Sequence, residues 1–208
     1  MKKLILALLI LTSAKAFSQT APTQTTPAPE EKGFLKKIAS RLEFGIKAGT
    51  NISNFDKFNI PTDPLIGYHG GLTVAYKFTD HFMVQEDFLY SLQGAKVQTG
   101  ILGTQDIKLS YLQVPILFKY RTSSGFFAEA GAQTGILLKE EIAGLNTGEK
   151  FAKKIDASAV GGIGYQSKMG LGIGARYAYG FTKVANTPSV ALGDFKNTTI
   201  QASLFYVF

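Results

Sequence analysis

The stretch GLGIGARYAYGF, residues 170–181, decides the fold because its side chains alternate between two kinds. One set of alternating positions is apolar or aromatic and comprises Leu171, Ile173, Ala175, Tyr177, Tyr179 and Phe181. The other set holds glycine, alanine and one charged residue, Arg176. Because successive side chains of a β-strand point to opposite faces, the stretch predicts a strand with one apolar face and one face of small residues plus a charge.

The same period of two recurs along the chain from Leu42 onward. The other segments that show it are residues 42–53, 68–78, 82–93, 107–120, 125–138, 155–166 and 197–208. Each is close to the roughly ten residues that a tilted membrane-crossing strand needs. In one of them Glu86 and Asp87 are adjacent, so one of the two must lie on the apolar face. We expect a β-bulge at this point to resolve the conflict.

The links between these segments alternate in length. The short links are residues 79–81, 121–124 and 166–168, and the long links are residues 54–67, 94–106, 139–154 and 182–195. Outer-membrane barrels have short periplasmic turns and long external loops, whereas a soluble barrel places its apolar residues inside. The sequence therefore predicts an all-β fold, an eight-stranded antiparallel up-and-down transmembrane β-barrel of OmpA or OmpX size, over residues 42–208, with both termini in the periplasm.

The predicted inward face carries several charged residues. They are Lys47, Lys119, Glu129, Asp156 and Arg176. A barrel of this size has an interior filled by side chains, and an unpaired charge there is costly. Folding the chain back at its tight turns brings Asp156 diagonally near Arg176 and Glu129 near Lys119. We expect these pairs to plug the lumen, so that the barrel does not conduct.

The two ends of the chain carry targeting features. Residues 1–18, MKKLILALLILTSAKAFS, have a basic start, a short apolar run and small residues before a cut, which predicts a Sec signal peptide. Residues 19–41 are rich in Pro, Thr and Gln and predict a disordered periplasmic linker. The chain ends in LFYVF, and the final Phe208 resembles the signal that the barrel insertion machinery reads. Lysines in the long links are placed to neutralise the phosphates of lipopolysaccharide, which we expect as a lipid partner.

Composition limits the chemistry that is open to this chain. The chain has no cysteine and two histidines, so thiol catalysis and a histidine metal cluster are not available. We expect no cofactor. Its net charge of +7 is scattered without a basic helix, which argues against nucleic acid as a partner.

His69 is the best candidate for catalysis, because a lipid A-modifying barrel enzyme would need a histidine near the outer leaflet. Ser53 ends the preceding strand and is the nearest candidate nucleophile. The chain has no His-x-Ser spacing at this point, so we expect His69 to be a structural residue and the protein not to be an enzyme.

Several stretches resemble one known family. They are FGIKAGTNISNF (44–55), YSLQGAKV (90–97), SYLQVPILFKY (110–120), GGIGYQ (161–166) and ARYAYGFTKV (175–184). Together they resemble the PorT-type outer-membrane β-barrel family of Bacteroidetes. The named member of that family belongs to a protein-secretion and gliding apparatus, so the resemblance implies a membrane barrel and a secretion or surface-assembly complex as one partner.

Three functions stay open at this point. The first is a non-enzymatic barrel whose external loops bind a partner or stiffen the membrane. The second is a component of a secretion or surface-assembly complex, and the third is a lipid A-modifying enzyme built around His69.

Overall fold

The structure is a computed structural model that describes residues 37–98, 103–142, 152–185 and 194–208. Residues 40–208 form one compact unit. The predicted signal peptide and most of the predicted linker lie outside the described residues. At the end of that linker, residues 37–39 form a single helical turn. The described part of the chain holds no helix that is long and apolar enough to span a membrane.

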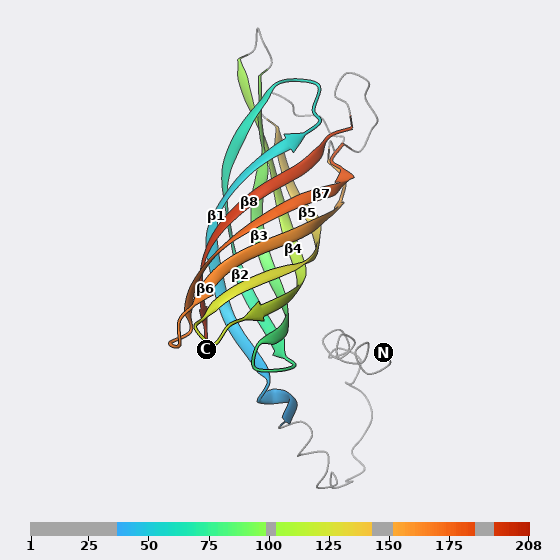
Figure 1. Cartoon of the computed structure of the whole chain (residues 1–208). Helices are drawn as coiled ribbons and strands as arrows, with labels where there is room; N and C mark the ends of the chain where they lie inside the picture. Colours follow the sequence, from blue (N-terminus) through green and yellow to red (C-terminus); the bar gives the residue numbers. More distant parts are fainter. Residues whose placement is uncertain (1–36, 99–102, 143–151, 186–193) are drawn as a thin grey trace, which may run out of the picture. The chain divides into compact units, whose positions relative to one another are not determined.

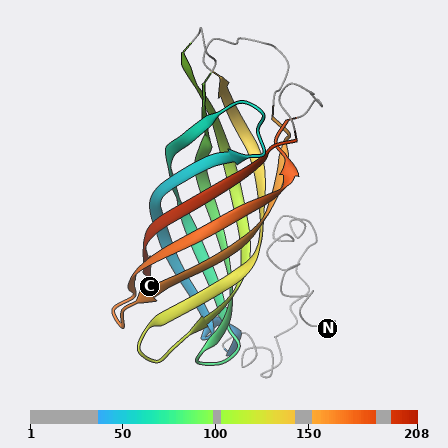
Figure 2. The same cartoon turned by 45° about the horizontal axis from the view of Figure 1, so that its top comes forward.

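The alternating segments fold into a closed antiparallel barrel in which each strand pairs with the next and the last pairs with the first (Figure 1; Figure 2). The strands are β1 (Leu42–Asp56), β2 (Thr62–Lys77), β3 (Phe82–Gln98), β4 (Thr104–Arg121), β5 (Phe126–Ile142), β6 (Ile155–Gln166), β7 (Leu171–Lys183) and β8 (Lys196–Val207). This confirms the predicted eight-stranded up-and-down barrel. The three tight links lie together at one end of the barrel, and the strand ends that flank the long links lie at the other (Figure 1).

The barrel is inverted relative to a soluble protein, because its apolar side chains point outward. On β7, Ile173 is 60% exposed whereas Arg176 is 5% exposed. The same alternation runs along the other strands, with large apolar residues outside and polar residues inside. An exposed apolar band of this extent suits a hydrocarbon solvent rather than water.

Aromatic side chains border this apolar band at both ends. Near the tight turns the ring centroids of Phe82 and Tyr120 lie 5.0 Å apart, and neighbouring strands add further pairs. Near the long loops, the rings of Tyr68 and Tyr90 lie 6.1 Å apart. Two belts of aromatic side chains, one at each end of the apolar band, are the interfacial girdles of a membrane barrel.

The glycines of the inward face make room for large side chains from across the lumen. A Cβ added to Gly164 would lie 2.4 Å from the ring of Phe127, and one added to Gly172 would lie 2.2 Å from the ring of Phe205. At Gly49, a Cβ would lie 2.7 Å from the imidazole of His69. These glycines therefore let aromatic rings and an imidazole fill the interior.

The bulge that we expected at Glu86 and Asp87 is wrong. Both residues pair in regular register with β2, where Asp87 lies opposite Thr73 and Glu86 opposite Val74. The register shifts lie elsewhere, at Pro64/His69, Ser110/Tyr111 and Tyr179/Lys183. Asp87 points into the lumen, where cations bind it, and the regular strand then leaves Glu86 on the outward face.

The outward assignment of Ile173 predicts the effect of a charge at this position. Ile173→Lys should lower the free energy of unfolding by about 1 kcal/mol, because it exposes an ammonium group to lipid close to the girdle near the tight turns, where Tyr165 is the register partner of Ile173. The measurement is the urea midpoint of the heat-modifiable gel shift in lipid vesicles. Ile173→Leu is the matched control and should keep the wild-type midpoint. An unchanged midpoint for Ile173→Lys would show that this face does not meet lipid.

Candidate functional site

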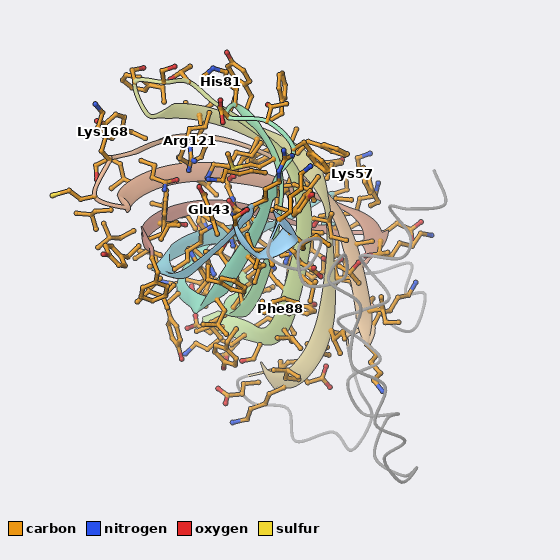
Figure 3. The ribbon with its side chains drawn as sticks, turned by 90° about the horizontal axis from the view of Figure 1, so that it is seen from below. Glu43, Lys57, His81, Phe88, Arg121 and Lys168 are labelled. Atoms are coloured by element: carbon orange, nitrogen blue, oxygen red, sulfur yellow. The ribbon has the colours of Figure 1, made fainter. Side chains whose placement is uncertain are left out.

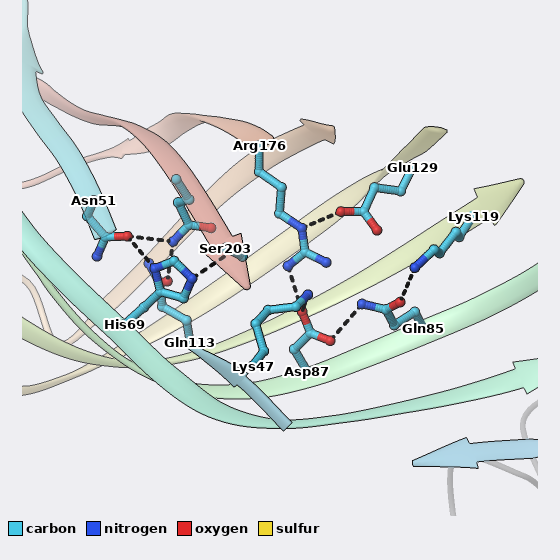
Figure 4. Close-up of polar contacts among 11 residues, drawn as sticks. Lys47, Asn51, His69, Gln85, Asp87, Gln113, Lys119, Glu129, Arg176 and Ser203 are labelled. Carbon is cyan, nitrogen blue, oxygen red and sulfur yellow. Dashed lines mark hydrogen bonds and ion pairs between the residues drawn. The ribbon is translucent and has the colours of Figure 1, made fainter. Parts of the chain in front are cut away.

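Charged side chains from five strands meet in the lumen and form what we call the lumen ion cluster. Its members are Lys47 of β1, Gln85 and Asp87 of β3, Lys119 of β4, Glu129 of β5 and Arg176 of β7 (Figure 4). All are buried. Burial of this many charges in a narrow interior is costly unless paired charges or hydrogen bonds compensate them.

Arg176 is the centre of the lumen ion cluster. Its Nη1 atom lies 2.6 Å from Oδ2 of Asp87, and its Nε donates to Oε1 of Glu129. The same Asp87 oxygen accepts from Nζ of Lys47 at 2.8 Å. One guanidinium therefore ties together strands β3 and β5 through their carboxylates, and the shared Asp87 adds β1.

Lys119 completes the lumen ion cluster without a carboxylate partner. Its Nζ donates to Oε1 of Gln85 at 3.1 Å and lies 3.8 Å from the ring centroid of Phe127. The amide of Gln85 in turn donates to Oδ1 of Asp87 at 2.8 Å. The ammonium is thus held by a relayed hydrogen bond and a cation–π contact.

These contacts differ from the pairs that we expected from chain fold-back. Arg176 does not pair with Asp156, whose carboxylate instead accepts from the hydroxyl of Thr182. Lys119 and Glu129 lie opposite each other in the β4–β5 register, but Glu129 binds Arg176 instead. The reason is that Arg176 is long enough to reach across the lumen over Gly162, where a Cβ would lie 2.8 Å from its Cγ.

His69 forms a second polar group in the lumen, beside the lumen ion cluster (Figure 4). Its Nδ1 lies 2.7 Å from Oδ1 of Asn51, and its Nε2 lies 2.9 Å from Oγ of Ser203. The amide nitrogen of Asn51 donates elsewhere, so Oδ1 is its acceptor and His69 carries its proton on Nδ1. Nε2 therefore accepts from the Ser203 hydroxyl.

Ser53, the partner that we expected for His69, does not contact it. Its hydroxyl donates to the carbonyl of Leu65 and accepts from the amide of Gly94. Ser203 takes the place instead because Gly49 lies between it and His69 in the strand register and has no side chain to separate them.

Little space remains around these groups. A cavity of about 20 Å³ is bordered by residues that include Lys47, Thr73, Ser203 and Phe205. This volume is close to that of one water molecule. His69 itself is 2% exposed.

An apolar plug closes the lumen toward the long loops. The rings of Phe55 and Phe195 lie 4.9 Å apart, and that of Phe58 lies 4.4 Å from Phe195. The buried residues that pack around them are Ala95, Val97, Ile107, Leu109, Tyr111, Ala152 and Val184. The lumen is thus filled by this apolar plug at one level and by the lumen ion cluster at another.

The tight-turn end has its own polar rim. Seen from this end, Glu43 and Arg121 lie at the mouth of the barrel (Figure 3). Arg121 binds Glu43 with two nitrogens, at 2.8 and 3.1 Å, and Gln166 at 2.7 Å. His81 lies in a tight turn, where its Nδ1 contacts the carbonyl of Arg121 at 2.9 Å.

None of the described residues form a group of three or more acidic or histidine side chains that could hold a metal ion. Among the described residues, most polar side chains of the lumen bind one another, whereas Nη2 of Arg176 and Oε2 of Glu129 are buried without a hydrogen-bond partner.

The family model for the outer membrane protein beta-barrel domain matches residues 17–186. The chain belongs to the outer membrane protein beta-barrel domain family. It is therefore an integral protein of the outer membrane. No curated protein sequence matches the chain.

Several solved structures of small outer-membrane barrels are similar to this outer membrane barrel. Neisserial surface protein A is 15% identical with a TM-score of 0.55 over 79% of this chain and 97% of that chain. OprG from Pseudomonas aeruginosa is 18% identical with a TM-score of 0.49, over 80% and 95%. Ail, the attachment invasion locus protein of Yersinia pestis, is 19% identical with a TM-score of 0.47, over 81% and 99%. At these identities the likeness to Neisserial surface protein A shows the fold alone.

Sequence reasoning placed Lys47, Lys119, Glu129 and Arg176 on the inward face of this outer membrane barrel. It missed Asp87, which binds Lys47 and Arg176, and Ser203, which binds His69. Asp87 was not assigned to a face, because it is adjacent to Glu86. The alternation along β3 could have assigned it, because Asp87 shares a face with Met83, Gln85 and Leu89, which are buried. Ser203 gave no signal beyond its inward position on the last strand.

The outer membrane barrel offers a double-mutant test of the Arg176 contacts. Arg176→Met should lower the free energy of unfolding by about 3–5 kcal/mol, because it leaves two carboxylates buried beside one fewer cation. Adding Glu129→Gln should cost less than the sum of the two single changes, since the residues interact directly. The measurement is the urea midpoint of the gel shift in vesicles. Arg176→Met with Asp156→Asn is the matched control and should be additive. If the costs of Arg176→Met and Glu129→Gln simply added in the double variant, this result would contradict a direct contact between Arg176 and Glu129.

Proposed function

We propose that this barrel is a non-enzymatic outer-membrane protein that binds a partner at the cell surface through the outer ends of β3, β4 and β5. These ends, residues 94–98, 104–110 and 139–142, are called the external blade below. Strands β3, β4 and β5 have 17, 18 and 17 residues, whereas β6, β7 and β8 have 12, 13 and 12. A membrane crossing uses about ten, so each long strand has about seven residues more than the crossing needs, which is about 20 Å measured along the strand.

The surface of the external blade supports recognition rather than burial in lipid. Lys96 and Asp106 are register partners, as are Lys108 and Glu141. Lys139 pairs with Glu141, and both side chains are more than half exposed. Exposed charges of both signs on a rigid ladder give a polar surface that suits a protein partner, and its lysines also suit lipopolysaccharide phosphates.

The filled lumen favours binding over transport. The apolar plug and the lumen ion cluster occupy successive levels of the interior, which removes a continuous aqueous path. An eight-stranded barrel has an interior just wide enough for its side chains. The outer surface is therefore where this protein acts.

The proposal includes export by the Sec route, insertion by the barrel machinery through Phe208, and periplasmic termini. The even number of strands supports this orientation, because it brings the first and last strand ends to the same end of the barrel. Phe208 donates its backbone amide to the carbonyl of Phe44, so the start of β1 and the end of β8 lie together at the tight-turn end. Short turns are periplasmic in outer-membrane barrels.

The arrangement of Ser203, His69 and Asn51 has the hydrogen bonds of a hydrolase triad but lacks room for a substrate. A triad needs space at the serine for an acyl carbon and for donors that bind the developing oxyanion. The adjoining cavity of about 20 Å³ admits a water molecule and not an ester. These contacts favour a role in ordering the lumen.

Membership of a secretion or surface-assembly complex is the second candidate. Its support is the resemblance of five stretches to the PorT-type family, and one of them, residues 90–97, runs into the external blade. A partner that binds this segment would fit either candidate.

The test is lysine-directed cross-linking in the native outer membrane, followed by gentle detergent extraction and mass spectrometry. We expect protein adducts at Lys108 and Lys139 of the external blade, and a loss of about tenfold when both are changed to serine. Lys168→Ser, in a tight turn at the other end, is the matched control and should leave the adducts unchanged. Adducts absent from the external blade, or insensitive to its lysines, would contradict the proposal.

A further inference from the structure

Glu86 is a carboxylate on the outward face of the barrel, in the middle of the wall. It lies between Val74 of β2 and Ile116 of β4 in the strand register. Its neighbours on the same face of β3 are Val84 and Phe88. In the part of the chain that the structure describes, no salt bridge reaches this carboxylate. Glu86 is thus a charge-bearing group surrounded by apolar side chains.

The depth of Glu86 separates it from water on both sides. Phe82, in the girdle near the tight turns, and Tyr90, in the girdle near the long loops, are each four residues away on β3. Four residues span about 13 Å of strand, or about 10 Å along the membrane normal at the usual tilt. A glutamate side chain is too short to reach either interface, unlike the long lysine and arginine side chains that do so.

The barrel itself does not supply a cation for Glu86. Between the two girdles, the other outward side chains of the described strands are uncharged. A second copy of the chain would therefore bring another apolar wall or a second Glu86, and neither supplies a cation. Lipid chains offer neither charge nor hydrogen-bond donors.

An ionisable group inside the membrane is costly, and it is usually retained where a partner compensates for it. We propose that the wall of β2, β3 and β4 around Glu86 binds a transmembrane segment of a different protein that presents a lysine or arginine to this carboxylate. This inference goes beyond the proposed function, because the contact lies within the membrane and away from the external blade.

The test places a photo-cross-linking amino acid, p-benzoylphenylalanine, on the wall in native outer membranes. Phe118 of β4 is 70% exposed and lies opposite Val84, diagonal to Glu86 on the same face, and Ile163 of β6 is 68% exposed on another part of the wall. We expect a protein adduct from position 118 and none from position 163. Glu86→Leu should reduce the adduct about tenfold, the size expected for one lost charge pair, whereas Glu86→Asp should keep it.

Two further readouts make the test decisive. Glu86→Leu should keep the heat-modifiable gel shift, because leucine suits lipid, and should keep the cross-links of Lys108 in the external blade. Sequencing the adduct should identify a transmembrane peptide with a lysine or arginine. Exchanging that residue for glutamate should restore the adduct of Glu86→Lys. No protein adduct at position 118, an adduct unaffected by Glu86→Leu, or an adduct with a second copy of this chain would overturn the proposal.

Discussion

The contact of Arg176 with Asp87 and Glu129 is the interaction on which the rest of the barrel depends. A strand that faces lipid on one side keeps its charges at lower cost on the other side, and here that side is a narrow lumen. Charges in such an interior are costly unless paired charges or hydrogen bonds compensate them. Arg176 meets this condition because it reaches across the barrel, over Gly162, to carboxylates from two other strands. The glycines of the inward face and the aromatic rings that fill their space follow from the same requirement.

The period of two in a β-strand links the interior to the membrane surface. Asp87 must point inward to bind Arg176 and Lys47, and a regular strand then turns its neighbour Glu86 to the lipid. A bulge would have freed Glu86 from this position, but the β2–β3 register is regular there. The interior pairing and the exposed carboxylate are therefore two consequences of one adjacent pair of acidic residues. The proposal that a partner binds Glu86 within the membrane therefore rests on the geometry of the strand.

Much of the fold could be predicted from the sequence because it is encoded locally. Eight alternating segments and links of alternating length depend on neighbours in the chain, and the strand order follows from them. The cross-lumen contacts could not be predicted in the same way. Arg176 and Asp87 are 89 residues apart and meet through the tilt and stagger of the closed barrel, which no local pattern contains. Reasoning from adjacent strands gave Asp156 as the partner of Arg176 for that reason, and it gave Ser53 rather than Ser203 for His69.

The filled lumen is the central claim of this account, because it assigns the activity of the protein to its surfaces. The apolar plug of phenylalanine side chains and the lumen ion cluster close the interior at separate levels, so the external blade and the membrane-facing wall remain as places for contact. The most direct measurement is single-channel conductance of the purified barrel in a planar lipid bilayer. The account predicts a silent bilayer after insertion is verified by gel shift. Stable, long-lived conductance steps from the folded barrel would contradict it and would make the lumen, rather than the surface, the working part of the molecule.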